Sequence, residues 1–394
     1  MKSLPFVLVC ALGMQGFAAS GPEHPSTPQV PSTTSYLFTN DDLPGKAGSN
    51  GSTVFPISAN GLLGTPTRVS LGGTGGGGGY FDAARMNLLQ GSSDGCAFGS
   101  IAASGEIGAI DINAMEVIGD FYGGTNDSGQ VNGIGLVNNG TYLYANFTGS
   151  NTIATFAIQS GCTLNFLGDV SALGMQSGNV KGMAVHQNIL VVAYGDGSIE
   201  SFNVSGGIPV SNGDLQNTTG FSTDQFAIGV DITADGHYAI FGDQSVVTAV
   251  EVSDISSGKL TKTKLYKLGT AANSANIYLS PDETLLYIAN TGSGQLTAAF
   301  FNAATGALKP GCTSPTLKKF DNTWIFLSSP VTELNTGTGS VVYMAEYGSS
   351  SGIAVVNVAS SGGKCTLTEA AGSPVLDPNS TTLLSIGVYP PRSF

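Results

Sequence analysis

The sequence predicts an all-β protein that folds as a single seven-bladed β-propeller of four-stranded blades. Three observations predict this fold class. A pattern of strand, turn and strand recurs along the 394 residues, glycine is abundant at 56 residues, and charged residues make up only 10% of the chain. Such repeats indicate an array of similar β-units that bury their faces against each other, with many tight turns and little helix.

The repeats are clearest in two segments, residues 274–311 and 133–169. The second strand of each repeat marks its position, and the markers begin at Tyr36, Ala97, Tyr142, Leu190, Tyr238, Leu286 and Val342. Their successive spacings are 61, 45, 48, 48, 48 and 56 residues. A period near 48 residues is that of a four-stranded blade, and it is too short for tandem immunoglobulin-like sandwiches.

An inner strand should precede each marker, and six of the seven repeats contain one. These strands begin at Ala84, Gly133, Lys181, Phe226, Ser274 and Pro330. The first repeat lacks an inner strand, whereas residues 383–390 (LLSIGVYP) form a strand with no repeat of its own. We therefore expect this last strand to complete the first blade, which closes the ring and leaves no open sheet edge.

The N-terminal residues predict export. Residues 1–20 contain one lysine, an apolar core over 4–12 and a small-residue run, which is the pattern of a cleaved secretory signal peptide. Residues 21–35 form a lead-in rich in Pro, Ser and Thr, and the propeller is expected over 36–394. The sequence therefore predicts a secreted or periplasmic protein.

The charge of the chain disfavours several kinds of partner. Lys and Arg number 14 against 27 Asp and Glu, which gives a formal net charge of −13. Binding of nucleic acid or of an anionic membrane requires a dense basic face, so neither partner is expected. After the signal peptide no stretch is long enough to span a bilayer, so we expect no membrane insertion, and we expect a monomer.

Two phrases carry a family resemblance. The segments SPDETLLYIANTGSGQLTAAFFNAATGALKPG and ITADGHYAIFGD resemble the blade signature of lactonase-type and YVTN-type seven-bladed propellers, a group that includes 6-phosphogluconolactonase-like proteins. The resemblance implies the propeller fold and lactone hydrolysis. It also implies a site at the channel mouth, where the loops that enter the inner strands gather with the loops between second and third strands.

The candidate catalytic residues are the charged residues near the starts of inner strands. Arg85, Lys181 and Glu333 occupy such positions in three different blades. If they converge, they can hold a carboxylate or polarise a carbonyl group. Gln225 and Asn276 are predicted to add hydrogen bonds to the ligand.

Other motifs are assigned to turns and connections. His186 and His237 fall between first and second strands, so we expect exposed turn residues on the face opposite the mouth. The glycine run 72–79 lacks the following Lys-Ser/Thr of a phosphate loop, and residues 40–42 match no calcium-loop spacing. No metal and no cofactor is expected.

Four cysteines remain after removal of the signal peptide: Cys96, Cys162, Cys312 and Cys365. An even number of cysteines in an exported chain is compatible with disulfides, and four cysteines allow three connectivities. Cys162 and Cys365 occupy equivalent places in distant blades, so a ring would keep them apart. Neighbouring blades allow Cys96–Cys162 and Cys312–Cys365, which is the pairing we predict.

Two functions remain open. The sequence favours an exported binding scaffold for a protein or carbohydrate partner, because it contains no clear acid/base pair. The alternative is a lactonase-like hydrolase of a sugar or muconate-type lactone that uses Glu333, Arg85 and Lys181.

Overall fold

The chain divides into two units, Met1–Thr33 and Thr34–Phe394, and every described residue belongs to the second. The computed structural model describes residues 35–41, 43, 48–76, 85–91, 95–123, 134–218, 227–243, 247–271, 274–318, 326–327, 332–335, 339–347, 351–380, 383 and 385–392. The predicted signal peptide and almost all of the predicted lead-in lie outside these residues.

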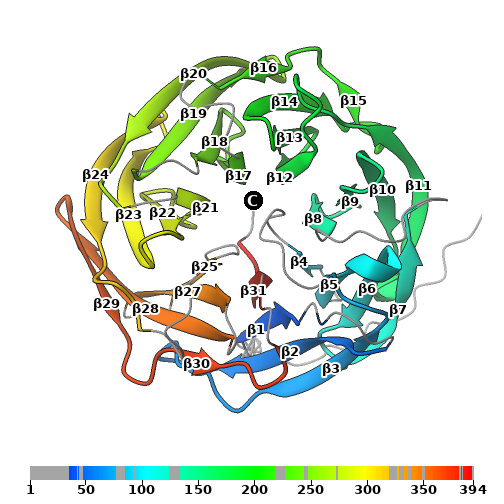
Figure 1. The fold of residues 1–394 in the computed structure, drawn as a ribbon, viewed down its shortest axis with the longest axis horizontal. Helices are drawn as coiled ribbons and strands as arrows, with labels where there is room; N and C mark the ends of the chain where they lie inside the picture. Colours follow the sequence, from blue (N-terminus) through cyan, green and yellow to red (C-terminus); the bar gives the residue numbers. More distant parts are fainter. Residues whose placement is uncertain are drawn as a thin grey trace, which may run out of the picture. The chain divides into compact units, whose positions relative to one another are not determined.

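The second unit is a seven-bladed propeller, as predicted (Figure 1). Blade 1 contains β31 (Ser385–Tyr389), β1 (Ser35–Asn40), β2 (Asn50–Ile57) and β3 (Thr67–Gly72). Blade 2 contains β4 (Met86–Gln90), β5 (Gly95–Ile101), β6 (Glu106–Asp111) and β7 (Glu116–Tyr122). Blade 3 contains β8 (Ile134–Asn138), β9 (Tyr142–Phe147), β10 (Thr152–Ile158) and β11 (Leu164–Ser171).

Blades 4 to 6 keep the same antiparallel order from the axis outward, and in blade 4 two short strands share the outer position. Blade 4 contains β12 (Val180–His186), β13 (Ile189–Tyr194), β14 (Ser198–Asn203), β15 (Val210–Ser211) and β16 (Gln216–Asn217). Blade 5 contains β17 (Ala227–Ile232), β18 (Tyr238–Asp243), β19 (Ala249–Ser256) and β20 (Lys259–Lys267). Blade 6 contains β21 (Ser274–Leu279), β22 (Leu285–Asn290), β23 (Gln295–Asn302) and β24 (Ala307–Thr313).

Blade 7 departs from the simple pattern, because its inner and outer positions are each divided between two strands. It contains β25 (Phe326–Leu327), β26 (Thr332–Asn335), β27 (Ser340–Tyr347), β28 (Gly352–Ser361), β29 (Lys364–Glu369) and β30 (Val375–Leu376). Two short 3-10 helices, η1 (Ala102–Ser104) and η2 (Ser160–Cys162), lie in turns of blades 2 and 3. No helix among the described residues has the length and apolarity needed to cross a membrane.

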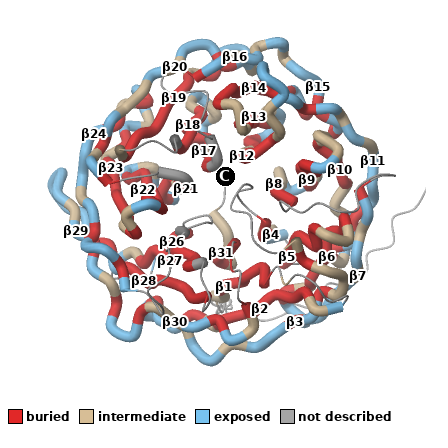
Figure 2. The backbone as a smooth tube through the Cα atoms, viewed as in Figure 1, coloured by how far each residue is buried: buried red, intermediate tan, exposed pale blue. Residues whose placement is uncertain are grey.

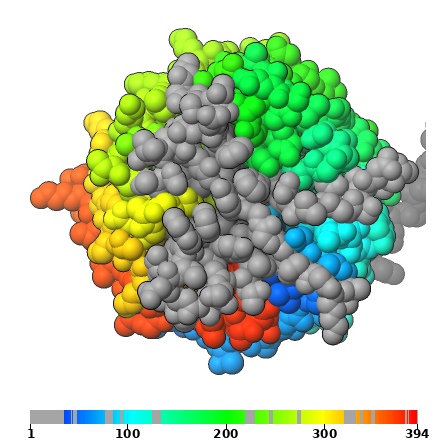
Figure 3. Space-filling model, viewed as in Figure 1, coloured from blue at the N-terminus to red at the C-terminus, as the bar shows by residue number. Residues whose placement is uncertain are grey.

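The strand from the C-terminal part of the chain closes the ring, which confirms the predicted closure. β31 pairs with β1 in antiparallel register, from Tyr36 opposite Tyr389 to Asn40 opposite Ser385. In the space-filling view, the red atoms of the C-terminal part lie beside the blue atoms of the N-terminal strands (Figure 3). β1, the second strand of the first blade, is therefore paired along both edges, with β31 on one side and β2 on the other.

Within the described part of the chain, seven buried apolar clusters hold the blades together, one at each junction between neighbours. The cluster between blades 2 and 3, for example, joins Phe98 to Phe147 and Phe156. Burial is strongest in the middle strands of each blade, and the outermost strands are mostly exposed (Figure 2); in blade 2, for example, β5 and β6 are almost completely buried and β7 is mostly exposed. Each cluster requires side chains from two sheets, so a single blade cannot bury its own faces.

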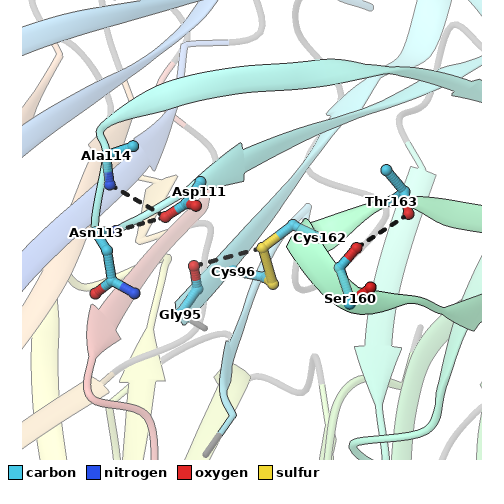
Figure 4. Close-up of a disulfide and its surroundings, with 8 residues drawn as sticks. All are labelled: Gly95, Cys96, Asp111, Asn113, Ala114, Ser160, Cys162 and Thr163. Atoms are coloured by element: carbon cyan, nitrogen blue, oxygen red, sulfur yellow. Dashed lines mark hydrogen bonds between the residues drawn. A yellow bond between two sulfur atoms is a disulfide. The ribbon is translucent and has the colours of Figure 1, made fainter. Parts of the chain in front are cut away.

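Two disulfides reinforce two of these junctions, with the predicted pairing. Cys96 on β5 is bonded to Cys162 in η2, which joins blades 2 and 3 (Figure 4). Cys312 on β24 is bonded to Cys365 on β29, which joins blades 6 and 7. Two disulfides indicate an oxidising location for the folded chain.

Candidate functional site

A cavity of about 550 Å³ lies on the axis of the propeller, and all seven blades contribute to its wall. Its lining comes from the inner strands β4, β8, β12, β17, β21, β26 and β31, and from residues 391 and 392. We call the end where inner strands begin the entry end, and the end where they finish the exit end. The last residues of β4, β8 and β12 line the cavity, so it extends to the exit end.

The wall of this channel cavity is largely apolar. Leu88, Val137, Met183, Val185 and Ile277 are buried side chains that line it. They come from four different blades, and each lies on a strand that converges on the axis. A concave apolar wall with a few polar groups is the usual form of a small-molecule site.

An ion pair crosses the exit end of the channel. Arg392 follows β31 of blade 1, yet its guanidinium binds Asp231 on β17 of blade 5 through two hydrogen bonds of 3.1 and 3.0 Å. The same guanidinium donates to the carbonyl oxygens of Leu279 and Ile232, at 2.6 and 2.9 Å. Asp231 also accepts the backbone N–H groups of Ile232 and Leu279, both at 2.8 Å. The pair therefore ties blade 1 to blades 5 and 6.

His186 is a buried imidazole in the channel cavity, which corrects the prediction of an exposed turn residue. It is the last residue of β12 and only 6% exposed. Gly236 in the next blade lies against the ring, because a Cβ at that position would be 2.9 Å from His186 Cδ2. Burial lowers the pKa of His186, with Asp235 acting against this shift and Arg392 adding to it. The imidazole is therefore neutral at pH 7 and able to accept a proton.

His237, in contrast, is exposed as predicted, and its ring lies 2.8 Å from the Asp235 carboxylate. The two histidines thus differ in environment, although both lie at the exit end of their blades.

Neutral hydrogen-bonding groups also line the channel cavity. The Asn138 amide donates to Asn87 Oδ1 and to the Leu88 carbonyl oxygen, which orients the Asn87 side chain. Among the described residues the Asn87 amide nitrogen donates no hydrogen bond, so it can serve a carbonyl oxygen in the cavity. The Tyr278 ring lies beside Arg392, with the guanidinium carbon 5.7 Å from its centroid.

The predicted residues Arg85 and Lys181 lie at the entry end, and both are buried. Arg85 is fully buried, and its carbonyl oxygen accepts the Asn40 amide of blade 1. Lys181 lies along the turn after β13, where its Cε would be 3.1 Å from a Cβ at Gly195. Neither residue lines the channel cavity.

The other predicted residues occupy separate places. The Glu333 carboxyl lies near Ser340 and Tyr287 of blades 7 and 6; burial raises its pKa, and hydrogen bonding from those side chains opposes the rise. Asn276 on β21 is buried and does not line the cavity. Gln225 lies outside the described residues. A joint role for Arg85, Lys181 and Glu333 stays a prediction.

The residues that sequence reasoning missed are His186, Asn87, Asp231 and Arg392. For His186 a signal was present, because the alternation of apolar residues in VKGMAVH continues to the histidine. For the Arg392–Asp231 pair no local pattern exists, since 161 residues separate the partners. Among the described residues no group of three or more His, Cys, Asp or Glu is arranged to hold a metal ion.

Comparison with solved structures shows the same fold. A candidate 6-phosphogluconolactonase from Bacteroides fragilis superposes with a TM-score of 0.67 at 14% identity, over 92% of this chain and 99% of that chain. The periplasmic gluconolactonase of Pseudomonas aeruginosa gives a TM-score of 0.66 at 13% identity, over 90% of this chain and 99% of that chain. A second candidate 6-phosphogluconolactonase, from Bacteroides uniformis, gives 0.65 at 13% identity, over 90% and 99%.

The sequence itself matches none of the curated proteins with which it was compared. It does match the family profile "Lactonase, 7-bladed beta-propeller" over residues 122–378, which is more than half of the chain. This match supports the hydrolase hypothesis better than the scaffold hypothesis that the sequence favoured. The protein therefore belongs to the lactonase family of seven-bladed β-propellers.

Proposed function

We propose that this protein is a lactone hydrolase whose substrate binds in the channel cavity. The observation that carries the proposal is a neutral, buried imidazole, His186, in the axial cavity of a lactonase-family propeller. Lactone hydrolysis needs a base for water and a donor for the carbonyl oxygen. His186 and the Asn87 amide supply these two functions.

The proposed reaction is a general-base hydrolysis. His186 takes a proton from water, and the water oxygen bonds to the lactone carbonyl carbon. The Asn87 amide donates to the carbonyl oxygen, which becomes negatively charged in the transition state. When the intermediate collapses, the ring C–O bond breaks, and the departing alkoxide takes the proton that the imidazole held. The product is a hydroxy acid, whose own carboxyl proton goes to water.

The test is hydrolysis of a lactone panel, followed by titration of the acid released at constant pH. We expect His186→Gln to lower kcat roughly 100- to 10,000-fold, the usual contribution of general-base catalysis. His237→Gln is the matched control, because His237 is exposed and does not line the cavity. Wild-type kcat/KM should fall only below pH 6.5, since the pKa of His186 is lowered from its ordinary value. Equal activity of the two variants would remove His186 from the mechanism.

A second pair of variants tests the position of the imidazole. Gly236→Ala puts a Cβ against the His186 ring, whereas Gly258→Ala places one at a similar positive φ (+76° against +71°) with no atom within 4 Å. We expect Gly236→Ala to lower kcat and to move the pH inflection, and Gly258→Ala to do neither. If both variants behave alike, backbone strain rather than displacement of His186 is responsible.

The predicted entry-end residues offer a rival site for the same reaction. Activity that is lost in Lys181→Met and retained in His186→Gln would favour Arg85, Lys181 and Glu333 over the channel cavity.

We also propose that the chain is exported through a signal peptide over residues 1–20, because the disulfides fit an oxidising compartment. The N-terminal sequence of the mature protein tests this proposal.

A further inference from the structure

We infer that the channel cavity selects an uncharged lactone with an apolar body, and that it disfavours phosphorylated lactones. The inference rests on the proposed function and adds the substrate class. Three observations support it: Arg392 at the cavity is paired with Asp231, most other cations lie on outer strands, and the cavity wall is largely apolar.

The positive charge that lines the cavity among the described residues is already neutralised. Arg392 binds both oxygens of Asp231 and two backbone carbonyl oxygens. Asp231 is in turn fixed by two backbone N–H groups. A phosphate would have to displace this carboxylate to reach the guanidinium, and the displaced carboxylate would be left buried without its partner. Breaking such a pair is strongly unfavourable.

Most other cations of the described chain lie far from the axis. Of the ten other Lys and Arg residues that the structure describes, seven are on outer strands of blades 1, 5, 6 and 7: Arg68, Lys259, Lys262, Lys264, Lys267, Lys309 and Lys364. Exposed charges at such positions are screened within about 8 Å at physiological salt. The net charge of −13 also makes the surrounding field unfavourable for an anion.

The wall suits an apolar body. Leu88, Met183, Val185 and Ile277 approach the cavity from three blades, and a hydrocarbon chain against them loses no hydrogen bonds on leaving water. A phosphate in the same place would lose its hydration without gaining a free cation. The lactone carbonyl still finds a neutral donor, the Asn87 amide.

The experiment compares three δ-lactones on the full chain: δ-decalactone, δ-gluconolactone and 6-phospho-δ-gluconolactone. The first is neutral and apolar, the second neutral and rich in hydroxyl groups, and the third a dianion. We expect kcat/KM for δ-decalactone to exceed that for the phosphorylated lactone by about 10- to 100-fold, the cost of one buried polar group left unsatisfied. A higher kcat/KM for either sugar lactone would overturn the inference and leave the proposed function intact.

Equilibrium binding separates this inference from the proposed function. The lactam of δ-decalactone is not readily hydrolysed, and calorimetric titration compares its affinity with that of 6-phosphogluconate. If no lactone is hydrolysed, the proposed function fails, and tighter binding of the lactam still supports the apolar site. Tighter binding of 6-phosphogluconate would contradict the inference whatever the activity.

A substitution tests directly whether the pairing of Arg392 with Asp231 decides substrate preference. Asp231→Asn removes the negative partner of Arg392. The ratio of kcat/KM for the phosphorylated lactone to kcat/KM for δ-decalactone should therefore rise about 10-fold, the value of a charge-assisted hydrogen bond. Asp254→Asn on β19 of the same blade is the control, because that residue does not line the cavity. An unchanged preference in a folded Asp231→Asn protein would show that Arg392 does not decide selectivity. If this variant does not fold, the wild-type comparison decides alone.

Discussion

The junction that closes the ring and the two junctions that carry disulfides hold their blades by different means. The disulfides join residues 66 and 53 positions apart in the chain. The closing junction, between blades 7 and 1, instead joins residues about 300 positions apart, through noncovalent contacts such as Tyr343 Oη with the Gly61 carbonyl oxygen and the Asn379 amide with Thr53 Oγ1. All three junctions contain a buried apolar cluster. The difference shows that covalent links reinforce neighbours, whereas closure depends on a strand from the far end of the chain.

The closing junction also carries a polar cluster built around two carboxyl groups, Asp41 and Asp377. Asp41 accepts the Thr39 and Thr53 hydroxyls, both at 3.0 Å, and forms an ion pair with Arg68. Asp377 lies close to it, and burial together with repulsion from Asp41 raises the pKa of Asp377 to about 6. This junction is therefore sensitive to pH, and a disulfide is not.

The largest effect should follow removal of residues 385–394, which deletes β31. Burial of Ile386 and Val388 is lost, roughly 3 to 6 kcal/mol, and β1 loses its five-residue pairing. This loss is comparable to the whole stability of a domain, so we expect no cooperative thermal unfolding. Addition of a peptide of sequence 383–392 should restore the transition in circular dichroism. A truncated chain with the wild-type Tm would show that β31 does not close the ring.

Removal of a disulfide should have a smaller effect, because the apolar cluster at that junction remains. For loops of 66 and 53 residues, the chain-entropy relation gives about 4 kcal/mol in each case. Urea unfolding of Cys96→Ala/Cys162→Ala and of Cys312→Ala/Cys365→Ala measures the two losses. We expect the two losses in free energy of unfolding to be nearly equal. A reductant should not destabilise the chain that lacks all four cysteines. A difference of several kcal/mol between the pairs would mean that local packing rather than loop entropy dominates.

The smallest effect should come from Asp377→Asn, and it should be a gain. The pKa of Asp377 is raised above its ordinary value of 3.8, so ionisation destabilises the fold as pH rises through about 6. We expect the variant to match the wild type near pH 4 and to be roughly 2 to 3 kcal/mol more stable at pH 7.5. Urea unfolding of the variant and of the wild type at both pH values gives the difference in free energy of unfolding. Burial also raises the pKa of Asp120 to about 6, but Asp120 is present in both proteins, so its contribution cancels. If the free energy of unfolding rises equally at the two pH values, better packing rather than removal of the charge stabilises the variant.

The fold was predictable because its signals are local and repeated. Every blade shows alternating apolar strands and glycine turns, and the position of β31 follows from the strand missing in the first repeat. The candidate site was less predictable, because side-chain direction depends on register to within one residue. Glu333 and Lys181 lie near the starts of their inner strands, as predicted. The Glu333 carboxyl nevertheless lies between blades 6 and 7, and Lys181 lies along a turn of its own blade. The sequence predicts His186 in a turn, yet the strand β12 extends as far as this residue.

The closure by β31 has a consequence for how the protein opens. An open stack of repeats frays from its two ends, so backbone amides near the ends exchange with solvent first. In this ring every blade has two neighbours, and no blade can separate without breaking two apolar clusters at once. Amide hydrogens of the second strands should therefore exchange at similar, slow rates around the circle, with no gradient along the chain.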